Sequence, residues 1–114
     1  MILFQLLFEV AEDKRAEFER TYAEVFEPAL RRQPGFQNVK FLRLYAPAQV
    51  AQIEAAPTEI NYQINFVFDS EQQRRAWAKT AEHDVAWPKL AALAKQALWR
   101  GYDILSSAVR PQTA

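Results

Sequence analysis

The chain has 114 residues, of which half are hydrophobic and 13% are aromatic. This is the length of a single domain, with enough apolar side chains for one core. Fourteen Lys and Arg residues balance fourteen Asp and Glu residues, whereas nucleic-acid-binding proteins usually carry a clustered positive excess. There is no cysteine and one histidine, which excludes disulfides and disfavours a zinc site. We expect one domain over 1–114, no bound metal and no nucleic-acid partner.

The N-terminal segment is apolar but short. Residues 1–8 lack the basic region and the small-residue cleavage site of a signal peptide. A membrane-spanning helix needs about 20 apolar residues. We therefore expect a cytoplasmic location and no membrane partner.

The first half of the chain changes from strand to helix and back. Residues 2–10 alternate between an apolar and a mixed face, which predicts a strand. Over 12–33 the apolar residues recur at helical spacing, and Pro28 within this stretch predicts a kink or the start of a tighter last turn. After a Pro-Gly turn, 37–45 alternates again and predicts a second strand. The proline- and alanine-containing stretch 46–58 predicts a loop with about one helical turn.

The second half repeats this change. Residues 59–68 alternate most strictly and predict a third strand. Ser70, with a glutamine three residues later, predicts a helix N-cap. The helical pattern breaks near Thr80 and then continues, so we expect a second helix in two segments that ends at Gly101. A last strand is predicted for 102–109.

The predicted order is therefore β-α-β-β-α-β with the second helix broken. This order is typical of an α+β, ferredoxin-like domain, in which helices cover one face of an antiparallel four-stranded sheet. The uncovered face would expose several apolar side chains of a single chain, and such a face usually marks an interface. We expect this face to pair with a second copy, and the residues concerned are Leu3, Leu7, Leu42, Leu44 and Val67.

Several segments resemble a known superfamily. The Pro-Gly-Phe turn at 34–36, the segment 68–87 with its Trp77 and His83, and the closing 102–105 are similar to the dimeric α/β barrel superfamily, in particular its antibiotic-biosynthesis-monooxygenase-like branch. The resemblance covers about 2–106. It implies a homodimer whose sheets pack face to face, with a pocket between sheet and helices in each subunit. Members include cofactor-independent oxygenases and haem-degrading enzymes.

Amide side chains gather on the nominally uncovered face. Gln5, Asn61, Gln63 and Asn65 share it by alternation. Amides donate and accept hydrogen bonds without charge, so they can hold a phenol, carbonyl or enolate oxygen in an apolar pocket. The resemblance implies that such a residue orients substrate, which makes Asn65 a catalytic candidate. Alternatively, the amides form a hydrated or cross-subunit hydrogen-bonded layer.

His83 is the only histidine. It can serve as a base or as an iron ligand, or it is simply a partly exposed residue at a helix start. The resemblance implies that haem-degrading members combine a helical histidine with a tryptophan and a strand asparagine. Here Gln5 stands in the strand instead of asparagine, which weakens the haem interpretation. Trp77 and Trp87 either line a pocket or belong to the core.

Three functions remain open at this stage. The first is a cofactor-independent monooxygenase or related enzyme for an aromatic, phenolic or quinol-type substrate. The second is a non-catalytic dimer that binds a small hydrophobic ligand, and the third is a structural dimer with a filled interior. For the first, we predict His83 and Asn65 as catalytic residues, with Gln5, Asn61, Gln63, Trp77 and Trp87 as substrate-binding residues. No cofactor is expected, and haem is the less supported alternative.

Overall fold

A computed structural model describes residues 1–111, so that the last three residues of the predicted domain lie outside the described part. Its four strands form one antiparallel sheet in the order β2-β3-β1-β4. This order confirms the predicted ferredoxin-like α+β fold. The strands are β1 (Ile2–Glu9), β2 (Phe36–Arg43), β3 (Tyr62–Phe68) and β4 (Gln96–Asp103).

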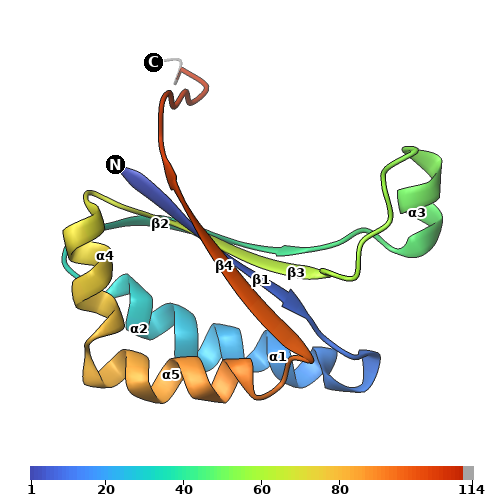
Figure 1. Cartoon of the computed structure of the whole chain (residues 1–114), viewed down its shortest axis with the longest axis horizontal. Coiled ribbons are helices and arrows are strands. Elements are labelled where there is room, and N and C mark those ends of the chain that lie inside the picture. The colour runs from blue at the N-terminus through green and yellow to red at the C-terminus, as the bar shows by residue number, and fades with distance from the viewer. Residues whose placement is uncertain (112–114) are drawn as a thin grey trace.

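Both helical connections cover the same face of the sheet (Figure 1). The first comprises η1 (Glu12–Lys14), α1 (Arg15–Thr21), η2 (Tyr22–Phe26) and α2 (Glu27–Arg31), and the second comprises α4 (Glu71–Ala78) and α5 (Ala81–Ala91). The short α3 (Pro47–Gln52) lies in the connection between β2 and β3. None of the helices within residues 1–111 is long and apolar enough to cross a membrane.

The core lies between the helices and the central strands β1 and β3. Leu6 and Phe8 of β1 and Ile64, Phe66 and Phe68 of β3 are buried there. Their even numbers place them on one face, because successive side chains of a strand point to opposite faces. Burying each such side chain contributes about 1.5–3 kcal/mol. The alternation read from the sequence therefore determines which face of the sheet the helices cover.

The predicted irregularity at Pro28 takes the form of a wider helical turn. η2 (Tyr22–Phe26) is a π-helical turn, and Pro28 lies in the first turn of α2 immediately after it. Proline has no backbone N–H to donate to the carbonyl of Glu24, four residues earlier. The wider π turn lets the chain continue as a helix next to that missing hydrogen bond.

The break in the second helical connection is set by two caps. The backbone N–H of Gln73 donates to the Ser70 hydroxyl at 3.2 Å, which begins α4. The backbone N–H of His83 donates to the Thr80 hydroxyl at 3.1 Å, which begins α5. Both caps satisfy N–H groups that have no partner within their own helix. The predicted N-cap and the predicted break are confirmed.

The boundary between the last helix and the last strand was predicted wrongly. α5 ends at Ala91 and β4 runs from Gln96 to Asp103, so this strand begins well before residue 102. Leu98 and Trp99 therefore belong to the strand, where Trp99 pairs with Leu6. Apolar residues in this stretch fit helical and alternating spacing equally, and pairing with β1 decides between the two patterns.

Within residues 1–111, no helix covers the other face of the sheet. Leu42 and Leu44 are exposed, as expected for an uncovered face. Leu7 and Val67 are buried, contrary to expectation. The reason is that Leu7 lies on β1 and Val67 on β3, the two central strands, so each has a paired strand on both sides. Side chains of neighbouring strands on the same face shield one another.

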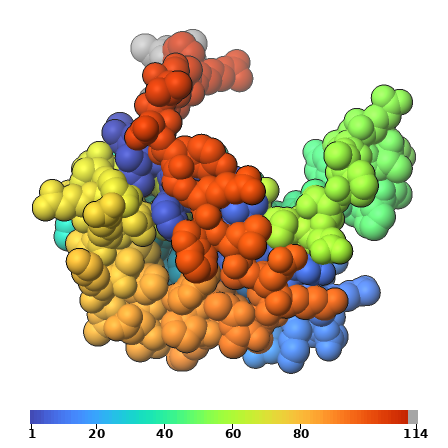
Figure 2. All heavy atoms as spheres, in the orientation of Figure 1, coloured from blue at the N-terminus to red at the C-terminus, as the bar shows by residue number. Residues whose placement is uncertain are grey.

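Two segments project on the side of this uncovered face. One contains α3, and the other is the C-terminal segment that follows β4 (Figure 1). Figure 2 shows both standing out from the body of the molecule. Their apolar side chains Ile53, Leu105 and Val109 are exposed to solvent.

Candidate functional site

A cavity of about 220 Å³ lies between the sheet and the second helical connection. Its wall is aromatic and apolar apart from one arginine and one histidine. The only histidine of the chain and all three of its tryptophans line it. The lining residues are Phe4, Leu6, Phe26, Phe66, Arg74, Trp77, Ala78, His83, Trp87 and Trp99.

Secondary structure explains why these side chains converge. Leu6 of β1 pairs with Trp99 of β4, so both lie on the helix-covered face of the sheet. On the helical side, Trp77 comes from the end of α4. His83 and Trp87 come from α5, where residues four apart share one face of the helix.

The three rings on the helical side contact one another in sequence. Trp77 is 3% exposed and meets the His83 ring edge-on, with 4.9 Å between ring centroids. His83 and Trp87 are nearly parallel at 6.4 Å and 13°. Trp87 in turn meets Trp99 edge-on at 6.0 Å. The imidazole therefore lies between two indoles, which fix its orientation by packing.

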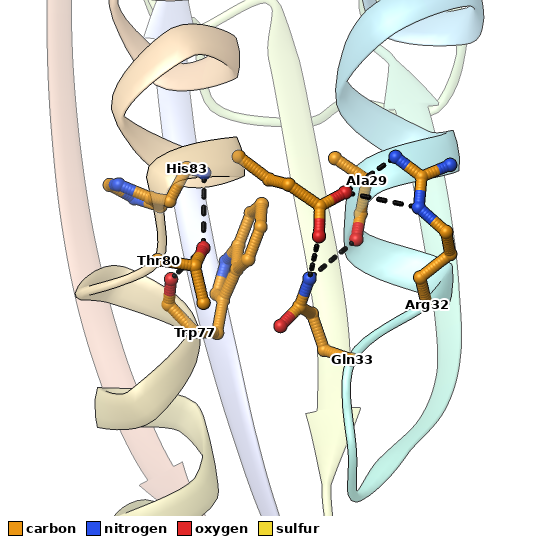
Figure 3. A network of polar contacts seen from close by, with 7 residues as sticks. Ala29, Arg32, Gln33, Trp77, Thr80 and His83 are labelled. Atoms are coloured by element: carbon orange, nitrogen blue, oxygen red, sulfur yellow. Dashed lines mark hydrogen bonds and ion pairs between the residues drawn. The ribbon is translucent and has the colours of Figure 1, made fainter.

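Polar contacts hold the backbone of His83 in place (Figure 3). The Thr80 hydroxyl accepts from the His83 N–H and donates to the carbonyl of Trp77 at 2.8 Å. Next to it, the Gln33 amide donates to the carbonyl of Ala29 at 2.9 Å and to Glu82 at 3.2 Å. These bonds tie the end of the first helical connection to the start of α5. The imidazole itself points away from this network (Figure 3).

The environment of His83 favours its neutral form. Burial lowers its pKa below the ordinary value, and the Arg74 charge adds to this effect, while Asp84 opposes it. The Asp84 carboxylate lies 4.0 Å from Nδ1, beyond hydrogen-bond distance. Within residues 1–111, neither ring nitrogen makes a hydrogen bond. At neutral pH the imidazole is therefore uncharged and one nitrogen can accept a proton.

Arg74 is the cation of the cavity wall, and sequence analysis missed it. Its Nε and Nη2 donate to the two carboxylate oxygens of Glu71 at 2.7 and 2.6 Å. Its guanidinium carbon lies 4.3 Å from the centroid of the Phe4 ring. Hydrogen bonds from Arg74, followed by those from Arg75, lower the pKa of Glu71 to about 2. Arg74 lies three residues before Trp77, a spacing that puts both on one helix face and could have identified it.

The predicted amides do not share this cavity. Gln5, Gln63 and Asn65 lie at odd positions of β1 and β3, and the lining residues of these strands lie at even positions. The amides form their own row on the uncovered face: Gln5 donates to Gln63 at 3.2 Å, and Asn65 donates to Gln63 at 3.5 Å. The expected grouping of these amides with His83 is therefore wrong, because the helices that carry His83 cover the other face.

Asn61 also lies away from the cavity. Its side chain bonds both backbone groups of Val10, with Oδ1 accepting at 2.9 Å and Nδ2 donating at 2.8 Å. It borders a wider hollow of about 960 Å³ beside the α3 segment. The two arginines at that hollow already make hydrogen bonds within the chain, since Arg15 donates to Tyr62 and Arg43 to Glu19. The aromatic cavity, with its unpaired imidazole, is the better candidate for chemistry.

Comparisons with known proteins agree on the fold. The sequence matches no protein-family model and no curated protein. Among solved structures, SnoaB, a cofactor-independent oxygenase from Streptomyces nogalater, is similar, with a TM-score of 0.71 and 20% identity over 93% of this chain and 94% of that chain. This chain shares its fold.

Two further structures show the same fold. A mutant of MhuD with two manganese protoporphyrin IX molecules bound per active site has a TM-score of 0.69 and 17% identity over 96% of this chain and 100% of that chain. A dimeric ferredoxin-like protein of unknown function from Thermobifida fusca YX has a TM-score of 0.67 and 17% identity over 90% of each chain. The fold is therefore found in proteins of different chemistry, and function has to be argued from the site.

The cavity does not fit a porphyrin. Its volume of about 220 Å³ is below the roughly 300–1,000 Å³ of pockets for drug-sized ligands. Trp77 and Trp87 also pack against the His83 ring, with 4.9 and 6.4 Å between ring centroids. The site is therefore assigned no haem chemistry.

Proposed function

We propose that this chain is a monooxygenase-type enzyme that oxidises a small phenolic or quinol-type substrate in the aromatic cavity without a cofactor. One observation carries the proposal: the single histidine and all three tryptophans line one cavity. Aromatic walls bind a flat ring, and a neutral imidazole accepts a proton from it. The shared fold with a cofactor-independent oxygenase is consistent with this chemistry.

The reaction can be written for a phenol with a free para position. His83 takes the phenolic proton, and the electron-rich phenolate reduces dioxygen, which is the only oxidant. One oxygen atom forms the new carbon–oxygen bond at the para carbon, and the other leaves as water with the two hydrogens that the substrate loses. The net change is 1-naphthol plus O₂ to 1,4-naphthoquinone plus water. Trp77 and Trp87 hold the ring beside the imidazole and exclude water.

The proposed working unit is a homodimer. The uncovered face of the sheet exposes Leu42, Leu98 and Tyr102, and two apolar segments project beside it. A second copy packed on this face would bury them. The row formed by Gln5, Gln63 and Asn65 then belongs to the interface. The ferredoxin-like relative from Thermobifida fusca YX is described as dimeric.

Oxygen consumption with one- and two-ring phenols, 1-naphthol among them, tests the proposal. Under ¹⁸O₂ we expect a quinone that carries one labelled oxygen atom. His83→Ala should lower the rate by about 100-fold or more, which is the usual contribution of a general base. Val85→Ala, at an exposed position of the same helix, serves as the matched control and should keep the wild-type rate.

Two outcomes would contradict the enzyme. If the phenols bind but none consumes oxygen, the chain is the non-catalytic binding dimer. If His83→Ala retains the wild-type rate, the oxidation does not use the imidazole and the assigned role is wrong.

A further inference from the structure

Arg74 is the one side chain with a fixed charge among those that line the aromatic cavity. Its side chain is 16% exposed. A largely buried cation is stable only if hydrogen bonds and opposite charge compensate it. The hydrogen bonds and opposite charges that the chain itself provides to Arg74 therefore indicate what a ligand of the cavity has to provide.

That compensation is incomplete. Glu71 is the carboxylate that pairs with Arg74, at 2.6 Å. The same Glu71 also pairs with Arg75, at 3.0 Å. The charge of Arg74 is thus balanced only by a carboxylate that it shares with the mostly exposed Arg75. Within residues 1–111, no carboxylate lines the cavity itself.

The guanidinium of Arg74 also has donors to spare. Nε and Nη2 bind Glu71, whereas Nη1 makes no hydrogen bond within residues 1–111. The ring of Phe4 covers one face of the group. An anion is therefore best received in the guanidinium plane, along the edge formed by Nη1 and Nη2, which matches a carboxylate.

We propose that Arg74 is a specificity-determining residue, and that the cavity takes a one- or two-ring aromatic acid whose carboxylate pairs with Arg74. Size supports this class: an apolar cavity of about 150 Å³ binds benzene in another protein, and this cavity measures about 220 Å³. The inference rests on the proposed function in so far as it takes the aromatic cavity as the ligand site. The inference adds that the substrate is negatively charged and that Arg74 is the residue that recognises this charge.

The test compares two probes of the same shape, 1-naphthoate and its neutral analogue 1-naphthamide. Isothermal titration calorimetry gives their dissociation constants. The tryptophan indole N–H resonances in a ¹⁵N-labelled sample report the location, because all three tryptophans line the cavity. We expect naphthoate to bind about tenfold or more tighter than naphthamide, as a hydrogen bond to a charged group provides. Both probes should shift the indole resonances.

Three variants identify the residue responsible. Arg74→Gln should remove the preference for naphthoate while leaving the affinity for naphthamide, which shows that the cavity is intact. Arg74→Lys keeps the charge and should retain part of the preference. Arg75→Gln is the matched control, because Arg75 contacts the same Glu71 but does not line the cavity, and it should keep the full preference.

The outcomes separate this inference from the proposed function. Equal binding of the two probes to the wild type, a preference that survives Arg74→Gln, or an equal loss in Arg75→Gln would overturn the role of Arg74 and leave the cavity as a ligand site. If neither probe releases heat nor shifts an indole resonance, the cavity is not a site for such rings, and the proposed function fails with the inference.

Discussion

At the scale of single residues, the surroundings of a side chain decide its chemistry more than its type does. His83 was predicted from its uniqueness and Trp77 and Trp87 from their size, and the structure places all three at one cavity. Alternation along a strand assigned Gln5 and Asn65 to a common face, but it could not tell which face meets the ligand. Arg74 was missed because a glutamate three residues before an arginine on a helix, as in Glu71 and Arg74, is typical of an ordinary surface ion pair.

The pH dependence of turnover should report the neutral state of His83. Burial lowers the pKa of His83 below 6.5, so its imidazole is a proton acceptor at neutral pH and loses this ability only when the pH falls through the lowered pKa. We expect kcat/KM for a phenol to fall on the acid side with a midpoint below 6.5. Rate measurements between pH 4.5 and 8 (an illustrative range of about two units around the ordinary value) would show it.

A midpoint at or above the ordinary histidine pKa would contradict the assigned burial of the imidazole.

The free energy of unfolding should also decrease as the pH falls. The unfolded chain takes up the proton first as the pH falls below 6.5, so the free energy of unfolding decreases from there through the folded-state pKa. His83→Gln should lack this component in urea titrations.

At the scale of elements, the sequence predicted the features that depend on interactions between neighbouring residues. The caps at Ser70 and Thr80 involve only neighbouring residues; the first was predicted as a cap, and the second was predicted as a break in the helix. The strand β4 depends on pairing with β1, which lies far away in the sequence, and its start was predicted too late. The π-helical turn before Pro28 was predicted only as an irregularity, because its type depends on how α1 and α2 both pack onto the sheet.

The cap of α5 should contribute to both stability and ligand affinity. Thr80→Ala removes the hydroxyl that binds the His83 N–H and should lower the free energy of unfolding by about 1 kcal/mol. Because the same bond fixes the backbone of His83, the affinity for an aromatic ligand should weaken as well. Thr80→Ser keeps the hydroxyl and is the control. Urea unfolding and calorimetry would measure the two effects, and equal behaviour of Ala and Ser would refute the role of the cap.

At the scale of the whole molecule, the two faces of the sheet have different surroundings. The helix-covered face bounds the cavity, and the uncovered face carries exposed leucines. Two segments project on the side of the uncovered face. Single-chain reasoning predicted this division from alternation alone. It could not predict that Leu7 and Val67 are already shielded by their cross-strand neighbours, since that depends on the register between strands.

Charge on the uncovered face should separate the proposed dimer into folded single chains. Leu42 and Leu98 are 41% and 40% exposed in the single chain, so glutamate is tolerated there without a partner but is costly at a buried interface. We expect the double variant Leu42→Glu/Leu98→Glu to halve the mass measured by light scattering, with unchanged circular dichroism. Val85→Glu, at a helix position that is 54% exposed, is the control and should stay dimeric. A dimeric double variant would place the interface elsewhere.

The central strand β1 belongs to both faces at once. Phe4 and Leu6 bound the cavity, and their immediate neighbours Leu3, Gln5 and Leu7 belong to the other face. A ligand that shifted this strand would therefore also move the surface proposed for a second copy, and this would link the two binding equilibria. The concentration of the protein itself then enters its apparent affinity for ligand, so that a titration of the dilute protein and one of the concentrated protein give different constants.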